Sequence, residues 1–225
     1  MTEPALIYVA DVMCSWCWGF APTVERLQRE LGLKVTIVNG GLRPGDSAEA
    51  LSPRMSTFLA GCWTDVGKAS GQPFDMAGLD RSPSWRYDTE PPAQAVATLR
   101  EQAPEHALTL FHRMQEAFYA HAVDIVDPGT WAPLLQGLVQ DVPEFIERAS
   151  GEHGRKLAWQ DFAQARRWGI SGFPCLLIDD DGELGLVTKG WAPGDTVVHG
   201  IQGWLDSRAA PVADGAACAI DGAGC

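Results

Sequence analysis

The sequence has no long apolar run and few basic residues. None of its segments approaches the roughly 18 consecutive apolar residues of a membrane-spanning helix, so we expect no membrane contact. Its 225 residues include 17 lysines and arginines against 29 aspartates and glutamates, a formal net charge of −12. A negative surface repels phosphate, so nucleic acid is not an expected partner. The start, Met1-Thr2-Glu3-Pro4, lacks the basic and then apolar pattern of a secretory signal, and we expect a cytoplasmic protein.

The sequence is also short of metal-binding patterns, although it contains six cysteines and five histidines. The histidines share no close spacing, and we expect no metal site. An even number of cysteines suggests a disulfide framework in a small secreted protein, but a cytoplasmic protein meets a reducing glutathione pool. The spacing of the cysteines therefore carries more information than their number. They are Cys14, Cys17, Cys62, Cys175, Cys218 and Cys225.

The N-terminal segment has the pattern of a β-α-β unit. Residues 5–10 form a short apolar run, which is typical of a buried strand. Between residues 20 and 31 apolar side chains recur every three or four positions, which predicts a helix that ends near Gly32. Residues 34–39 alternate and predict a second, parallel strand, which a right-handed crossover through the helix would join to the first.

The middle of the chain is helical in pattern, and the end returns to strands. Between residues 47 and 168 we expect helices, with a loop at residues 71–88. One of these helices places Cys62 on its apolar face. Residues 175–178 and 184–188 predict an antiparallel hairpin, and Asp195 is expected to cap a closing helix. This order predicts an α/β fold interrupted by a helical insertion. The predicted divisions are a discontinuous α/β domain at 1–45 and 155–207, the insertion at 46–154, and a flexible, cysteine-containing tail at 208–225.

Two cysteines separated by two residues lie at the junction of the first strand and the first helix. The spacing in Cys14-Ser15-Trp16-Cys17 brings both sulfurs within reach of a disulfide bond. The first sulfur faces the unpaired N–H groups and the positive end of the helix, which stabilise a thiolate. This arrangement predicts that Cys14 attacks a disulfide and that Cys17 resolves the mixed disulfide by intramolecular attack.

Two other interpretations of this pair remain open. A structural zinc ion needs four ligands, and the second cysteine pair in the chain, Cys218 and Cys225, has a wider spacing and lies in the tail. Two merely buried thiols are the other alternative. The position of the pair between a strand and a helix disfavours both.

Together with Gly169-Ile170-Ser171-Gly172-Phe173-Pro174, the junction resembles the DsbA-like branch of the thioredoxin superfamily. The segment Asp11-Val12-Met13-Cys14-Ser15-Trp16-Cys17-Trp18-Gly19-Phe20 resembles the FrnE-type members, in which a helical domain interrupts a thioredoxin fold. The resemblance implies a disulfide oxidoreductase or isomerase. It also implies that Pro174 is a cis proline beside the cysteines, whose exposed backbone edge pairs with an extended substrate. The expected substrate-binding residues are then Ser15, Trp16, Phe173 and Pro174.

The sequence departs from this family six residues before the first cysteine. Many thioredoxins and DsbA proteins have a buried carboxylate there, whereas this sequence has Tyr8. Asp11 is the nearest substitute as a proton acceptor, and a turn or cap residue is its alternative role. The dipeptide between the cysteines also lacks the histidine of DsbA, so we expect a less oxidising pair.

The other cysteines have different expected roles. Cys62 and Cys175 occupy apolar helix and strand positions and are expected to be buried and inert. Cys218 and Cys225 either form a second redox pair that exchanges with the first or are incidental exposed thiols.

The leading functional prediction is a thiol-disulfide oxidoreductase that acts as a reductase or isomerase on protein or peptide substrates, because the cytosol is reducing. No bound cofactor is expected, and glutathione is a candidate redox partner. One alternative is a glutathione-dependent enzyme of the kappa-class transferase or 2-hydroxychromene-2-carboxylate isomerase type. Those enzymes place a serine at the catalytic position, so the presence of both Cys14 and Cys17 disfavours them. The other alternative is a substrate-binding module or holdase without turnover. The sequence does not indicate whether the protein is a monomer or an oligomer.

Overall fold

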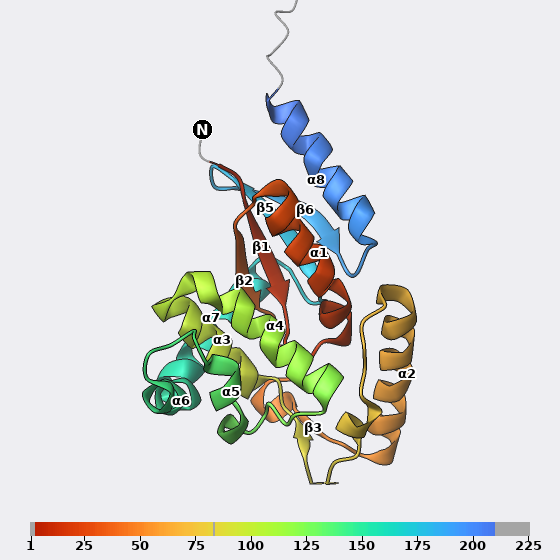
Figure 1. Cartoon of the computed structure of the whole chain (residues 1–225), viewed down its shortest axis with the longest axis vertical. Helices are drawn as coiled ribbons and strands as arrows, with labels where there is room; N and C mark the ends of the chain where they lie inside the picture. The colour runs from red at the N-terminus through yellow and green to blue at the C-terminus, as the bar shows by residue number, and fades with distance from the viewer. Residues whose placement is uncertain (1–2, 83, 210–225) are drawn as a thin grey trace, which may run out of the picture.

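A mixed four-stranded sheet forms the centre of the fold in the computed structural model, which describes residues 3–82 and 84–209 (Figure 1). β1 is parallel to β2 and antiparallel to β5, and β5 and β6 form an antiparallel hairpin. β6 is an edge strand of this sheet. The strands, in the order β2-β1-β5-β6, are β1 (Ala5–Ala10), β2 (Val35–Asn39), β5 (Cys175–Asp180) and β6 (Glu183–Lys189).

The sheet carries an apolar layer on each face because successive strand residues point in opposite directions. On one face, Leu6 and Tyr8 of β1 join an apolar cluster with residues of α1 (Ser15–Leu31) and α8 (Gly194–Ala209). These two helices contact each other and lie side by side in Figure 1. On the other face, Val9 belongs to a separate cluster with Ala165 of α7 (Glu152–Arg167).

The helical segment between β2 and α7 packs directly against the sheet and α1. α3 (Glu90–Gln102) contacts α7 and β2, and α4 (Pro104–His121) contacts α1 and β2. In Figure 1 these helices gather around the end of the sheet toward which β1 runs. The other elements of the segment are the helices α2 (Pro53–Ser70), α5 (Ala132–Leu135) and α6 (Val142–Ser150) and the single-turn helices η1 (Gly45–Ser47), η2 (Met76–Leu79) and η3 (Pro128–Thr130).

The prediction for residues 47–168, helices interrupted by a loop at 71–88, misses one small sheet. A two-stranded antiparallel sheet joins β3 (Glu49–Ala50) to β4 (Arg86–Tyr87). Each strand is only two residues long, so it has no periodicity that a sequence pattern could reveal. This small sheet fixes the position of Tyr87, which reaches the candidate site described below.

Two predictions of side-chain placement are also wrong. α2 buries Trp63 completely, whereas Cys62 is only half-buried. Adjacent helical residues lie about 100° apart, so a small rotation decides which of them faces the core, and the larger tryptophan buries more apolar surface. Asp195 lies inside the first turn of α8 and does not cap it, and its carboxylate pairs with Arg26 of α1 at 2.7 Å.

The mixed α/β class and the order of the main strands and helices agree with the prediction. The division into a discontinuous domain and an insertion remains a prediction, and the proposed tail pair, Cys218 and Cys225, lies outside the described residues. None of the helices formed by residues 3–82 and 84–209 is both long and apolar enough to cross a bilayer. Within the described part of the chain, no three or more histidine, cysteine, aspartate or glutamate side chains are arranged to hold a metal ion.

Candidate active site

Cys14 is the residue at which the chain enters α1. Its backbone is extended, with φ −91° and ψ 114°, and its N–H donates a hydrogen bond to the carbonyl oxygen of Asp11 at 3.1 Å. Its own carbonyl oxygen accepts a helical hydrogen bond from the N–H of Trp18 at 3.1 Å. Because no side chain caps this end of α1, the unpaired N–H groups of the first turn lie beside the Cys14 side chain. This is the positive end of the helix dipole, which favours an anion.

The two cysteines differ in their access to solvent. Cys14 is 8% exposed and Cys17 is fully buried. The Cys14 thiol donates a weak hydrogen bond to the carbonyl oxygen of Phe173, with 3.7 Å between sulfur and oxygen. Burial raises the pKa of the Cys17 thiol well above its usual value, and the hydrogen bond and charge of Cys14 raise that pKa further. Cys14 is therefore the sulfur that an incoming group can reach, and Cys17 stays protonated behind it.

A cis peptide bond between Phe173 and Pro174 lies beside the cysteine pair, as the resemblance implied. Pro174 directly precedes β5, and its carbonyl oxygen accepts a hydrogen bond from the N–H of Gly190 at 2.7 Å. The Phe173 ring covers Gly40 at the end of β2. A Cβ atom built on Gly40 would lie only 2.2 Å from ring carbons, so only glycine leaves room for this ring.

Two buried tyrosine hydroxyls hold the backbone on either side of the pair. Tyr8 donates a hydrogen bond to the carbonyl oxygen of Cys17 at 3.2 Å, and Tyr87 donates one to the carbonyl oxygen of Met13. Burial raises the pKa of Tyr8 well above its usual value, and the charges of Cys17 and Cys14 raise it further. Burial likewise raises the pKa of Tyr87. Both groups therefore remain hydroxyls and serve as donors.

Asp11 is a buried carboxylate at the end of β1, with 1% of its surface exposed. One carboxylate oxygen accepts a hydrogen bond from the N–H of Met13 at 2.9 Å, and the other accepts one from the N–H of Leu42 at 2.7 Å. Burial raises the pKa of Asp11 to about 6, even though these amide hydrogen bonds lower it. The charge of Asp11 in turn raises the pKa of Cys17. Asp11 thus joins the turn and also acts electrostatically on the buried thiol.

Aromatic side chains border the reachable side of the pair. Ser15 and Trp16, which lie between the cysteines, are half-buried. The Trp16 ring packs against Trp191, with 5.7 Å between ring centroids and an interplanar angle of 45°. The Trp191 indole N–H donates a hydrogen bond to the carbonyl oxygen of Gly19 at 3.0 Å, which ties the loop after β6 to α1.

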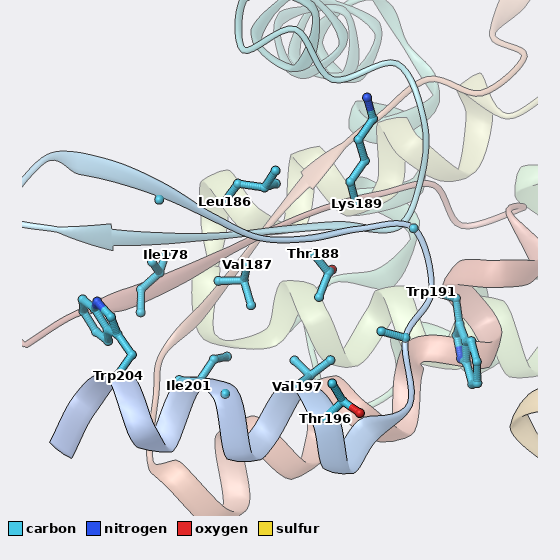
Figure 2. Close-up of a pocket in the computed structure, with 14 residues that line it drawn as sticks. Ile178, Leu186, Val187, Thr188, Lys189, Trp191, Thr196, Val197, Ile201 and Trp204 are labelled. Atoms are coloured by element: carbon cyan, nitrogen blue, oxygen red, sulfur yellow. The ribbon is translucent and has the colours of Figure 1, made fainter. Parts of the chain in front are cut away.

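An apolar groove of about 550 Å³ runs from Trp191 between β6 and α8 (Figure 2). Trp191 and Trp204 lie at its two ends, and Val197 and Ile201 of α8 face Val187 across it. Gly190 and Trp191 line one end of the groove, and they also hydrogen-bond to Pro174 and to Gly19 of α1, so this end lies near the cysteine pair. Its apolar lining suits aliphatic or aromatic groups.

The other described cysteines occupy different places. Cys175 is buried on the far face of the sheet, in the cluster that contains Val9 and Leu177. Cys62 lies on α2 and, contrary to the prediction, is partly accessible. All four described cysteines are free thiols.

Three neighbours of the site were not identified from the sequence: Gly40, Tyr87 and Trp191. Tyr87 contacts Met13, which lies 74 positions earlier in the sequence. Trp191, near the C-terminus, packs against Trp16, near the N-terminus. No local spacing connects such residues. The two glycines that follow the second strand were the one available signal, because consecutive glycines often mark a close approach of the backbone to another group.

Comparisons with known proteins assign the class. A family model of the DSBA-like thioredoxin domain matches residues 5–202. The chain therefore belongs to the family of DsbA-like thioredoxin domains, and the predicted thioredoxin fold is confirmed. Curated protein sequences contain no match to this chain.

Solved structures provide more specific similarities. A Nitrosomonas europaea protein, proposed to be a protein disulfide isomerase, is 30% identical with a TM-score of 0.81, covering 92% of this chain and 99% of that one. The cytosolic disulfide reductase DsbM from Pseudomonas aeruginosa is 24% identical with a TM-score of 0.76, covering 90% and 99%, and DsbM has also been solved with glutathione. A 2-hydroxychromene-2-carboxylate isomerase shares the fold at 12% identity and a TM-score of 0.63, covering 91% and 97%.

Proposed function

We propose that the protein is a cytoplasmic thiol-disulfide oxidoreductase that reduces or isomerises disulfide bonds in protein or peptide substrates. The observation that carries this proposal is the position of Cys14, at the uncapped N-terminus of α1 and 3.7 Å from the Phe173 carbonyl oxygen. The helix dipole favours a thiolate at that position. Membership of the DsbA-like family and the similarity to a protein named as a disulfide reductase support the same class of reaction.

In the first step, the Cys14 thiolate attacks one sulfur of a substrate disulfide. A new bond forms between Cys14 and the substrate, the substrate disulfide breaks, and the released substrate thiolate takes a proton from solvent. Ser15 and Trp16 on one side, and Phe173 and Pro174 on the other, contact the substrate chain. The backbone of the cis-proline loop pairs with an extended segment, as an added strand pairs with a sheet edge.

In the second step, Cys17 loses its proton and attacks the Cys14 sulfur. The second substrate thiol leaves, and Cys14 and Cys17 form a disulfide, so two electrons have passed to the substrate. The raised pKa of Cys17 makes this deprotonation the demanding event. We assign its proton to Asp11, because a buried carboxylate with a pKa of about 6 is a stronger base than an exposed one.

Glutathione is the proposed reductant that completes the cycle. Two glutathione molecules reduce the Cys14–Cys17 disulfide and leave as glutathione disulfide, which balances the two electrons given to the substrate. The similarity to DsbM, which has been solved with glutathione, supports this choice. No bound cofactor is needed for either half of the cycle.

Equilibration in graded glutathione buffers tests the proposal. Free thiols are alkylated at each potential, and the cysteine pairs are mapped by mass spectrometry. A Cys14–Cys17 midpoint near about −270 mV assigns a thioredoxin-like reductant, and a midpoint of about −120 to −200 mV assigns an oxidant or isomerase. The matched variants are Cys14→Ser, which must abolish insulin disulfide reduction, and Cys175→Ser, which must leave it unchanged. Failure of Cys14 and Cys17 to pair across the whole range would overturn the dithiol mechanism and favour a glutathione-dependent transferase.

A further inference from the structure

α2, which carries Cys62, packs against α1, which begins at the cysteine pair. The two helices touch at Gly19, where an added Cβ atom would lie 2.7 Å from Cγ1 of Val66 and 3.2 Å from Ser70. Ser70 and its neighbour Ala69 also border a hollow with Pro22 of α1, the next turn after Gly19. Later residues of α2 thus face later residues of α1, so the helices run in the same direction.

This packing determines which turn of α1 lies opposite Cys62. Cys62 is one helical turn before Val66, and Ser15 is one turn before Gly19. Since Val66 packs against Gly19, the same face of α2 one turn earlier, which carries Cys62, faces the start of α1, where Cys14 lies. Cys62 also packs against the same apolar cluster that contains Cys14 and Cys17.

The pKa of the Cys62 thiol responds to the charge of Cys14. Burial and the charge of Asp65 raise the pKa of Cys62, and the charge of Cys14 raises it further. Cys175 is different, because burial raises its pKa, Lys189 lowers it, and it lies on the other face of the sheet. Cys62 is also partly accessible, unlike Cys175.

We infer that Cys62 is a third redox-active thiol of the site, which can resolve a mixed disulfide at Cys14 in place of Cys17. This inference rests on the proposed role of Cys14 as nucleophile. The Cys62 thiolate attacks the Cys14 sulfur, a Cys14–Cys62 disulfide forms, and the bond between Cys14 and the substrate breaks. The substrate leaves as a thiolate and takes up a proton, so atoms and electrons balance without a further oxidant.

A later exchange restores the ordinary pair. Cys17 attacks the Cys14 sulfur of the Cys14–Cys62 disulfide, and Cys62 leaves as a thiol. Cys62 thus provides a second route for releasing a substrate that stays bound to Cys14 as a mixed disulfide. Since the thiolate is the attacking species, release of substrate by Cys62 becomes faster as pH rises.

The test uses the full chain and glutathione disulfide as the probe. In Cys17→Ser, glutathione disulfide first adds one glutathione to Cys14. We expect the intact mass then to lose that glutathione, and peptide mapping to show a Cys14–Cys62 disulfide. In Cys17→Ser/Cys62→Ser the adduct should persist at least about tenfold longer, because both thiols that we expect to resolve it have been removed. Cys17→Ser/Cys175→Ser is the matched control and should behave like Cys17→Ser alone.

The outcomes separate this inference from the proposed function. If Cys17→Ser holds its glutathione as long as Cys17→Ser/Cys62→Ser does and gives no Cys14–Cys62 peptide, the inference is wrong while Cys14 remains the nucleophile. If Cys17→Ser/Cys62→Ser gains no glutathione at Cys14, the proposed function itself fails. The peptide map of Cys17→Ser decides the matter even if the double variant is poorly folded.

Discussion

The hydroxyl of Tyr8 donates a hydrogen bond to the carbonyl oxygen of Cys17 at 3.2 Å, in the interior of the protein. The pKa of Tyr8 lies well above its usual value, so this group offers a proton and does not accept one at neutral pH. At position 8 this chain therefore has a buried hydroxyl that supports α1 and does not act as a base at neutral pH.

Replacement of Tyr8 by phenylalanine should affect stability more than chemistry. Tyr8→Phe removes one buried hydrogen bond, and we expect a loss of about 1 kcal/mol in the free energy of unfolding. The pH profile of disulfide reduction should keep its shape between about pH 6 and pH 9, since Tyr8 does not ionise there. Urea unfolding and insulin reduction measure the two effects. A shifted profile would show that Tyr8 takes part in proton transfer.

Replacement of Asp11 by asparagine should change how stability depends on pH. The pKa of Asp11 is about 6 in the folded protein and near 3.8 in the unfolded chain. Because the folded value is raised, the wild type gains stability from a protonated Asp11 at low pH and loses it as pH rises from about 4 to about 6. The difference in the free energy of unfolding between wild type and Asp11→Asn should change by on the order of 3 kcal/mol across that window.

Urea unfolding at several pH values measures this difference. Asp46→Asn, which changes an exposed carboxylate, is the control and should follow the wild type. A parallel pH dependence of wild type and Asp11→Asn would contradict the raised pKa. The same variant should also lower the pH at which Cys17 is alkylated in a Cys14→Ser background, because the charge that opposes the Cys17 thiolate is gone.

A methyl group at Gly40 should disturb the cis-proline loop. Gly40→Ala places a Cβ atom 2.2 Å from the Phe173 ring, which must move. We expect a loss of about 1–3 kcal/mol in stability and slower disulfide exchange, since the Phe173 carbonyl oxygen is the partner of the Cys14 thiol. In a Phe173→Ala background the same change at Gly40 should cost little, and a double-mutant cycle measures that coupling. Additive effects would exclude this explanation.

Removal of Trp191 should weaken binding of apolar substrates. Trp191→Ala deletes a ring that packs on Trp16. The same ring forms one end of the groove between β6 and α8. We expect KM to rise several-fold for peptides with an aliphatic residue beside the cysteine, with kcat nearly unchanged. Trp159→Ala, at a partly exposed tryptophan on α7, is the control. Equal KM values for both variants would mean that the groove does not contact substrate.

Local patterns in the sequence predicted the main elements and the cysteine pair because both depend on short spacings. The strand at 5–10 and the hairpin at 175–189 have periods that span a few residues, and the spacing of Cys14 and Cys17 fits one helical turn. The same reasoning fails where two choices are locally equivalent. Cys62 and Trp63 are both apolar neighbours on α2, and only packing against the rest of the chain decides which is buried.

Contacts between distant segments were beyond these patterns. Tyr87 reaches Met13 only because two strands of two residues each hold it there, and the buried Asp11 carboxylate accepts a hydrogen bond from the N–H of Leu42 in the loop after β2. Neither effect leaves a periodic signal. The resemblance to a family supplied Pro174, which composition and spacing alone would describe only as a proline at the start of a strand.

The end of the sheet at the β5–β6 turn offers attachment points for a surface or a fused domain that lie away from the cysteine pair. Arg208 in the last turn of α8 pairs with Asp180 at 2.6 Å, and Ala5 at the start of β1 lies opposite Asp179. Both places are at the end of the sheet away from Cys14, which follows the other end of β1. A bead, electrode surface or fused domain joined near either place would leave the cysteine pair facing outward. The protein is thus suited to single-molecule or electrochemical measurement of disulfide exchange in an oriented layer.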